Sequence, residues 1–451
     1  NFFFRKEYWW ELLGKILRTG ESYGQVDAGQ RTLVQVEFVS ANPTGPLHVG
    51  HGRGAACGDS LANLLSVAGY QVQREYYIND VGRQMETLGR STWIRYRQLL
   101  GQSDPFPEDG YQGDYIREIA QEIIRSQGNH YLEMAEKDVL PFFLQYAKEH
   151  IMDGIRKDLQ DFGVTFNQWF SERTLYEQGA VESALALLKE RGHLYEEEGA
   201  QWLRTTAFGD DKDRVVVRSS GQMTYFASDI AYHQEKFQRG VKRIIDIWGA
   251  DHHGYEPRMR AVVQCLGYPA DTLNVVLVQL VTLLREGKPV SMSTRSGEFV
   301  TLREVLDEVG RDAARFIFLT RRSDSPLDFD LDVAKKQSQE NPVYYVQYAH
   351  ARIVSLFRQA EEKGIGFSTG AGKNADLSLL VLPEEIRMIK LLAGYPDIVR
   401  ESALALEPHR VTFFLLDLAG ILHPYYFRHR IITEDQALTL ARLTLMKGIQ
   451  G

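Results

Sequence analysis

Two histidines, His48 and His51, stand three residues apart in a segment rich in proline and glycine, 41–54. The segment follows the apolar run 33–39 and leads into residues 59–65, which is the order of a strand, a tight turn and a helix start. Free backbone N–H groups and the positive end of the helix dipole attract anions at such a start. Residues three apart are neighbours on a helix, so both imidazoles are expected on one face of the first turn. This pattern favours a phosphate site, and a triphosphate in particular.

Two other roles for the histidine pair stay open at this point. A His-x-x-His pair can ligate zinc, but zinc sites usually take a third protein ligand, and no cysteine pair or His-Glu-x-x-His motif lies nearby. The imidazoles can also serve only to cap a helix. Glycine favours the phosphate interpretation because it removes side chains where a nucleotide would lie against the backbone. The glycines of this segment are Gly45, Gly50, Gly52 and Gly54.

A second polar cluster, Asp251-His252-His253, follows the apolar run 243–248. Ligands of open parallel sheets bind at the carboxyl ends of the strands, so the cluster stands where a ligand is expected. Carboxylate and imidazole are good metal ligands, and this order resembles the Asp-His-His signature of one phosphoesterase family. Such a metal site would need further clusters, and the other candidate carboxylates are scattered. Contact with a ribose and a polar substrate, a metal site and a structural role all remain open.

A third segment, 287–297, is small, polar and cationic. It follows the apolar run 273–284, which we expect to be a buried strand. A loop of this kind can close over a triphosphate, and its cations, Lys288 and Arg295, would stabilise the charge on a departing pyrophosphate. Taken alone, the segment is more typical of a surface hairpin with glycine at each end.

A parallel sheet is needed to bring these segments together. Apolar runs alternate with helical patterns, which is a β-α-β order. Charged amphipathic segments predict a helical insertion at about 83–218, and the chain after 330 shows only helical periodicity. We therefore expect an α/β fold, with a Rossmann-like parallel-sheet catalytic domain that carries a helical insertion and is followed by an all-α helical bundle. The expected strands are 33–39, 72–78, 243–248 and 273–284, and the expected helices include 54–67, 256–266, 341–360, 384–406 and 408–428.

Composition sets the broad class. The chain has 451 residues, 44% of them hydrophobic and 25% charged, which is ordinary for a soluble globular protein of two or three domains. No apolar run is long enough to span a membrane, and the first residues are too charged for a signal peptide. Isolated Cys57 and Cys265 favour a reducing compartment, so we expect a cytoplasmic protein. The net charge of −8 is −9 over residues 1–330 and +1 over residues 331–451, and such a near-neutral tail is compatible with a polyanion partner.

Together, the segments resemble the signatures of the class I aminoacyl-tRNA synthetases. His48-Val-Gly-His51 is similar to the HIGH motif of that class, and Ser291-Met-Ser-Thr-Arg295 is similar to its KMSKS loop. Within the class, four further segments resemble the arginyl-tRNA synthetase family, and the resemblance extends over essentially the whole chain. These segments are 37–48, Asn79-Asp80, 249–255 and 341–352.

The resemblance implies ATP-dependent activation of L-arginine and transfer of the arginyl group to tRNA(Arg), with Mg²⁺ arriving with ATP rather than in a dedicated metal site. In-line displacement at a phosphate needs positioning and charge stabilisation. A carboxylate suits a planar guanidinium and rejects lysine by bidentate pairing. The implied catalytic residues are His48, His51, Lys288 and Arg295. The implied ATP contacts are Gly50, Gly52, Asp251, Met292 and Ser293. The implied arginine contacts are Glu37, Asn42, Tyr225, Asp229, His252 and His253.

The helical tail would recognise the tRNA, because aromatic and cationic side chains suit unstacked bases and phosphates. Tyrosines at helical spacing also pack in cores, so we expect some of the tail's aromatic residues to be structural. The implied tRNA contacts are Tyr344, Tyr348, Arg352, Arg428 and Arg430. The implied division is the end of an N-terminal domain at 1–24, a catalytic domain at 25–330 and an anticodon-binding domain at 331–451.

The chain departs from the family pattern in two ways. Ser291 and Thr294 stand where the class I loop has lysines, so Lys288, Arg295 or Arg285 would supply the cation. The chain also lacks an initiating methionine and stops short of the family's usual end, so we expect a piece of a longer protein. The resemblance favours a monomer, with no membrane partner.

Two other functions remain as alternatives. A metal-dependent phosphoesterase built on residues 251–253 predicts manganese-dependent activity. A nucleic-acid-binding module that keeps the fold without catalysis is suggested only by the missing lysines of 291–295, and His48, His51 and Asp229 oppose it.

Overall fold

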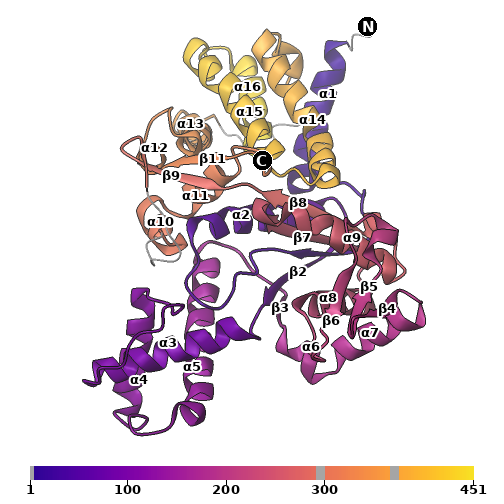
Figure 1. The fold of residues 1–451 in the computed structure, drawn as a ribbon. Coiled ribbons are helices and arrows are strands. Elements are labelled where there is room, and N and C mark those ends of the chain that lie inside the picture. The colour runs from indigo at the N-terminus through magenta and orange to yellow at the C-terminus, as the bar shows by residue number, and fades with distance from the viewer. Residues whose placement is uncertain (1–4, 291–299, 366–374) are drawn as a thin grey trace.

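A computed structural model describes residues 5–290, 300–365 and 375–451. A central sheet flanked by helices joins two helical regions that lie at opposite ends of the molecule (Figure 1). One region is an arm of three helices, and the other contains the carboxyl-terminal helices together with the first helix. The arm consists of α3 (Arg83–Leu99), α4 (Asp114–Gln127) and α5 (Glu136–Asp161).

The main sheet is parallel throughout, with the strand order β3-β2-β1-β7-β8. The chain leaves β1 toward β2 and β3 on one side and returns to β7 and β8 on the other. Ligands bind at the carboxyl ends of the strands where such an order reverses, here between β1 and β7. The predicted parallel-sheet class is confirmed. The strands are β1 (Leu33–Glu37), β2 (Gln71–Ile78), β3 (Gln168–Ser171), β7 (Arg243–Gly249) and β8 (Leu273–Val278), and the connecting helices include α2 (Val49–Val67) and α9 (Glu256–Cys265).

Two segments differ from the sequence-based expectation. The predicted insertion 83–218 contains β3, which pairs with β2 in the main sheet, so the helical arm ends before it. The predicted strand 273–284 is two strands, because the chain turns at Leu280, which is 76% exposed, and β9 (Val281–Arg285) joins another sheet. A continuous apolar run does not reveal where a strand changes sheets.

The remaining elements surround the main sheet. After β3 the chain forms two helices and an antiparallel sheet, and then the long helix α8 (Tyr225–Gln238). A further small sheet with the order β10-β9-β11 lies near the start of α2. The other bounds are α6 (Arg173–Glu177), α7 (Ala180–Glu190), β4 (Leu194–Glu197), β5 (Ala200–Leu203), β6 (Arg214–Val217), β10 (Lys288–Pro289), α10 (Leu302–Val309), α11 (Arg311–Phe318), β11 (Leu327–Asp330) and α12 (Leu331–Lys335).

The carboxyl-terminal region is a helical bundle with its own core. It contains one helix beyond those expected, and α1 (Lys6–Thr19) packs on it through Leu13 and through a hydrogen bond from Trp10 Nε1 to the carbonyl of Leu380 at 3.1 Å. In the described residues, no helix is both long and apolar enough to cross a membrane. The bundle helices are α13 (Pro342–Glu362), α14 (Pro383–Ala405), α15 (His409–Arg428) and α16 (Gln436–Gln450).

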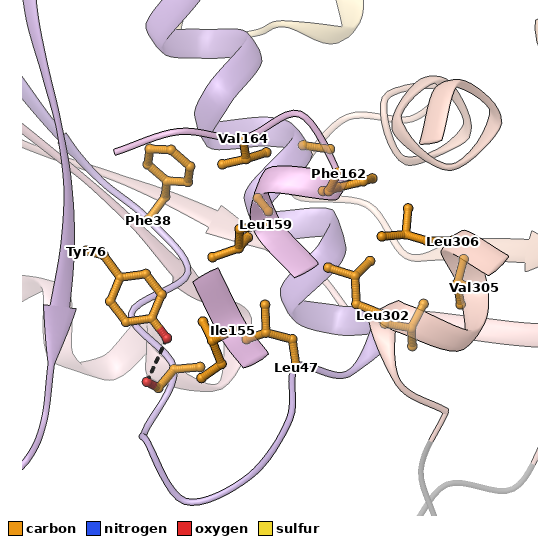
Figure 2. Close-up of a cluster of buried hydrophobic side chains, with 14 of the residues drawn as sticks. Phe38, Leu47, Tyr76, Ile155, Leu159, Phe162, Val164, Leu302, Val305 and Leu306 are labelled. Atoms are coloured by element: carbon orange, nitrogen blue, oxygen red, sulfur yellow. Dashed lines mark hydrogen bonds between the residues drawn. The ribbon is translucent and has the colours of Figure 1, made fainter. Parts of the chain in front are cut away.

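An apolar core lies under the turn between β1 and α2 (Figure 2). Phe38 and Leu47, at the two ends of the turn, are fully buried, and Tyr76 of β2 donates a hydrogen bond of 2.9 Å to the carbonyl of Ala41. The end of α5 and helix α10 supply Leu159 and other apolar side chains to the same cluster. This buried cluster holds the turn between β1 and α2 in place, and that turn carries part of the candidate site.

Candidate active site

The two histidines predicted to bind phosphate cap the first turn of α2. His48 is the N-cap residue: its Nδ1 accepts the N–H of Gly50 at 3.1 Å, and the Nδ1 of His51 accepts the N–H of His48 at 3.2 Å. The two rings stack with their centroids 3.7 Å apart. Because each Nδ1 is an acceptor, each neutral ring carries its proton on Nε2. Both residues therefore cap the helix and also bring an N–H donor to its positive end.

Both imidazoles are neutral at physiological pH. Burial lowers the pKa of His48, and burial together with His48 lowers the pKa of His51 to about 3. A neutral imidazole with an Nε2–H can donate to a phosphate oxygen. Such fixed donors stabilise the charge that develops in a displacement at phosphorus.

The glycines of this turn have a packing role. A Cβ on Gly50 would lie 3.0 Å from the ring of His48, and a Cβ on Gly52 would lie 2.8 Å from Leu302 of α10. Gly50 thus lets the His48 ring fold over the turn, and Gly52 lets α2 pack closely on α10. Packing alone explains both glycines, so their contact with ATP stays a prediction.

The backbone between β1 and α2 is held in a strained conformation. Val39 and Ser40 have φ angles of 69° and 39°, which cost about 1–3 kcal/mol per residue. Ser40 Oγ donates to Glu37 Oε1 at 3.0 Å and accepts the N–H of Tyr77 at 3.1 Å. These bonds hold Glu37 at the carboxyl end of β1, and the same turn leaves Asn42 exposed a few residues further on.

Asp229 lies on the first turns of α8, one turn after Tyr225. It is half-buried and accepts a hydrogen bond from the hydroxyl of Tyr255, which stands just before α9. Burial raises the pKa of Asp229 to about 6 in spite of that bond. Tyr225 is 56% exposed, so its side chain is accessible beside this carboxylate. A half-buried carboxylate of this kind is stabilised by a cation.

The sequence reasoning missed Glu172, which follows β3 directly. Its side chain is buried and bonded to Ser228 and Tyr77, and burial raises its pKa to about 7, with the nearby Asp229 adding to the shift. The rule that ligands meet the carboxyl ends of parallel strands would have selected this residue. It could not be applied because β3 was not recognised as a strand.

Three carboxylates therefore gather at one place, which we call the acidic cluster: Glu37, Glu172 and Asp229. All three act on the phenol of Tyr77 in β2, whose pKa is raised first by burial and then by these carboxylates. They come from the ends of β1 and β3 and from the start of α8. The structure thus brings Glu37 and Asp229 together as predicted and adds Glu172.

Asp251, His252 and His253 lie in a short 3₁₀ helix after β7, at the sheet edge where they were expected, but all are exposed. Their bonds are local: His252 pairs with Asp251 at 3.5 Å, and His253 Nδ1 bonds the carbonyl of Ala250 at 3.0 Å. Tyr255, rather than either histidine, contacts Asp229. Within the described ranges no three His, Cys, Asp or Glu side chains gather as a metal site would require.

The cationic segment is described only in part. Met292, Ser293 and Arg295 lie outside the described residues. Lys288 is exposed on β10, and Arg285, the other candidate cation, is paired with Glu308 at 2.7 Å. The catalytic role of Lys288 therefore stays a prediction.

The bundle presents a stacked aromatic and cationic group on α13. The rings of Tyr344 and Tyr348 stack with centroids 5.5 Å apart, and the Arg352 guanidinium lies 4.4 Å from the Tyr348 ring centre. Arg352 also bonds the buried His423, which fixes it to α15. Arg428 and Arg430 are exposed at the end of α15, and Phe427, which the sequence reasoning did not select, is 90% exposed there.

Comparison with known protein families gives two matches. Residues 12–326 match the family of class I tRNA synthetases for arginine, catalytic domain, and residues 346–450 match the DALR anticodon binding domain. Together the two matches cover the main sheet, the arm and most of the bundle.

Named relatives are similar over the full chain. The arginine–tRNA ligase of Desulfosudis oleivorans is 59% identical over 451 residues, which is 100% of this chain and 81% of that protein. The arginine–tRNA ligase of Citrifermentans bemidjiense is 56% identical over 99% of this chain and 80% of that protein. A crystal structure from Campylobacter jejuni, provisionally assigned as an arginyl-tRNA synthetase, superposes with a TM-score of 0.90 at 34% identity and covers 99% of this chain and 96% of that chain.

Proposed function

We propose that this chain, which belongs to the class I arginyl-tRNA synthetase family, ligates L-arginine to tRNA(Arg) through an arginyl-adenylate. The arginine carboxylate would attack the α-phosphate of ATP and expel pyrophosphate. A hydroxyl of the terminal ribose of the tRNA would then take the arginyl group and release AMP. Displacements of this kind depend on positioning and electrostatics more than on covalent catalysis.

The acidic cluster is the observation that carries the proposal. Arginine carries two cationic groups, the α-ammonium and the guanidinium, and three carboxylates from the ends of β1 and β3 and the start of α8 lie near the Tyr77 phenol. Asp229, with Tyr225 and Glu172 beside it, would bind the guanidinium, since a carboxylate matches its planar pair of N–H donors. Glu37, with Asn42, would bind the α-ammonium.

The histidine turn would act on ATP. The Nε2–H donors of His48 and His51 would hold phosphate oxygens at the positive end of α2, which begins at the far end of the turn that follows Glu37. Mg²⁺ would enter with the ATP phosphates, which supply the oxygen ligands that this ion prefers. Lys288 or Arg295 would supply the cation that stabilises the departing pyrophosphate.

The bundle would bind the anticodon. The DALR match covers α14, α15, α16 and most of α13, and the exposed Tyr348 with the half-buried Arg352 beside it suits an unstacked base and a phosphate. Cytoplasmic location and a monomeric state belong to the same proposal.

Arginine-dependent exchange of labelled pyrophosphate into ATP tests the proposal. The assay uses the full-length protein, ATP and Mg²⁺, with and without cognate tRNA, because this family is expected to need tRNA for activation. Exchange that requires both arginine and tRNA supports the function. No exchange in the complete mixture would reject it, and manganese-dependent phosphodiester hydrolysis would favour the phosphoesterase alternative.

A further inference from the structure

Lys236 of α8 is a fully buried lysine that contacts the acidic cluster. Its Nζ donates to Glu37 Oε2 at 2.7 Å and to Asp246 Oδ1 at 3.0 Å, and it lies 4.3 Å from the centre of the Tyr232 ring. The side chain is 0% exposed. Lysine is almost never buried to this degree unless it is paired.

The two carboxylates that Lys236 joins are neighbours in the sheet. Glu37 of β1 and Asp246 of β7 are partners in the register of adjacent parallel strands, at the point where the strand order reverses. Asp246 is also buried and is within 3.2 Å of His233 Nε2. Two carboxylates this close on one side of a sheet repel each other, and Lys236 lies between them.

Lys236, Glu37 and Asp246 together carry a net charge. Two carboxylates and one ammonium leave an excess of one negative charge, and Glu37 is the member that reaches the proposed arginine site, with 12% of its side chain exposed. Both Glu37 oxygens already have donors, Lys236 on one and Ser40 on the other. Glu37 is therefore oriented before any ligand binds.

We propose that Lys236 is a positioning residue for arginine binding, which with Asp246 fixes the orientation and the charge of the Glu37 carboxylate. The inference rests on the proposed role of Glu37. In this role Lys236 does not touch the substrate and acts only through Glu37.

The electrostatics of the site agree with this role. Burial raises the pKa of Glu37, Lys236 lowers it, and Asp246 and Glu75 raise it again. Although burial opposes it, the attraction of Asp246 and Glu37 raises the pKa of Lys236, so the lysine stays charged. Removing Lys236 would therefore shift the Glu37 pKa further upward, toward neutral pH. Other ionisable groups near Glu37 are Asp229, Tyr77 and Tyr232, and His233 bonds the neighbouring Asp246.

A set of charge variants tests the inference in the tRNA-dependent exchange assay. Lys236→Met leaves two adjacent carboxylates that must share a proton, so we expect the arginine KM to rise by about 10- to 100-fold while the ATP KM stays unchanged. The arginine KM of this variant should fall as the pH is raised, because Glu37 regains its charge. Lys236→Met/Asp246→Asn restores the parental excess of one negative charge, so its arginine KM should return toward the parental value.

The controls separate this role from a structural one. Arg97→Met breaks a partly buried ion pair with Asp104 beside the arm helix α3, 2.7 Å long, and should lower the melting temperature without changing the arginine KM or its pH profile. Glu37→Gln should raise the arginine KM at every pH. If Lys236→Met does not fold, the charge-balanced double variant still gives a measurement, because it lacks the Lys236 donor that orients Glu37 and its arginine KM should therefore exceed the parental value. An arginine KM equal to the parental one in the double variant would overturn the orienting role.

Each contrary result has one meaning. An unchanged arginine KM in Lys236→Met, with a raised one in Glu37→Gln, would overturn the positioning role and leave the arginine site in place. A double variant whose arginine KM is raised at least as much as that of Lys236→Met would also overturn it. An unchanged arginine KM in Glu37→Gln would instead reject the proposed role of Glu37, on which the inference rests.

Discussion

Replacing Asp229 by asparagine removes the charge of the acidic cluster at the proposed guanidinium site and keeps the shape of the side chain. Asparagine retains one acceptor oxygen, so the Tyr255 hydroxyl keeps a partner, but one charge-assisted bond and the ionic attraction to the substrate are lost. Losing one member of a desolvated, hydrogen-bonded charge pair costs about 2–4 kcal/mol. The arginine KM should therefore rise roughly 30- to 1,000-fold, with little change in the ATP KM.

The same variant should be more stable than the parent. In the folded protein burial raises the pKa of Asp229 to about 6 from 3.8, so the folded state binds its proton more tightly than the unfolded chain does. The free-energy cost of ionising Asp229 in the folded protein is absent below the pKa of the unfolded state and is complete above the pKa of the folded state. At neutral pH it amounts to about 3 kcal/mol, which asparagine would largely remove. A raised melting temperature at neutral pH, together with a lost arginine affinity, would distinguish a functional carboxylate from a structural one.

The pH dependence gives a second readout of Asp229. Arginine binds the ionised carboxylate, so the parental arginine KM should rise about tenfold per pH unit below about pH 6. Asp229→Asn should lack that dependence. The assay is tRNA-dependent pyrophosphate exchange at varied arginine concentration, with thermal unfolding measured on the same samples. An unchanged arginine KM in Asp229→Asn would refute the assigned role.

Three other perturbations follow from the site. His48→Ala should lower kcat for activation by about 10²–10³-fold. His48→Asn keeps an N-cap acceptor for α2, so it should retain the stability of the parent but lose its activity. Equal activities of His48→Asn and the parent would show that the imidazole only caps the helix. Glu172→Gln should raise the arginine KM by about tenfold and raise the melting temperature at neutral pH, since burial raises the pKa of this group to about 7, and an unchanged arginine KM would exclude it from the site. Deletion of 331–451 should abolish charging of tRNA, and charging that survives the deletion would remove the anticodon-binding role of the bundle.

The fold was predictable where the hydrophobic pattern is unambiguous. The strands expected at 33–39, 72–78 and 243–248 correspond to β1, β2 and β7, and their parallel order is confirmed. The short strand β3 was missed, because only one of its side chains is buried, and Glu172 was missed with it. The boundary between β8 and β9 was missed because both strands are apolar.

The residue types of the candidate site and their positions along the chain were predictable from the sequence. The contacts between these residues were less predictable. The strand pattern placed the histidine turn and the cluster 251–253 at strand ends, whereas Glu37 and Asp229 were assigned as arginine contacts only through the family resemblance. The sequence could not show that Tyr255, two residues after the histidine pair His252-His253, is the group that contacts Asp229. The pairing of Lys236 with Glu37 joins residues 199 positions apart, and only the packing of α8 against β1 and β7 reveals it.

Comparison of arginine with citrulline in tRNA charging tests the central claim most directly. Citrulline has the length of arginine and replaces the cationic guanidinium with a neutral ureido group, so it lacks the charge that the acidic cluster is proposed to bind. We expect the full-length protein to charge cognate tRNA with arginine and to prefer arginine over citrulline by at least about 10³-fold in kcat/KM. Comparable charging with both amino acids, or charging with neither, would contradict the claim.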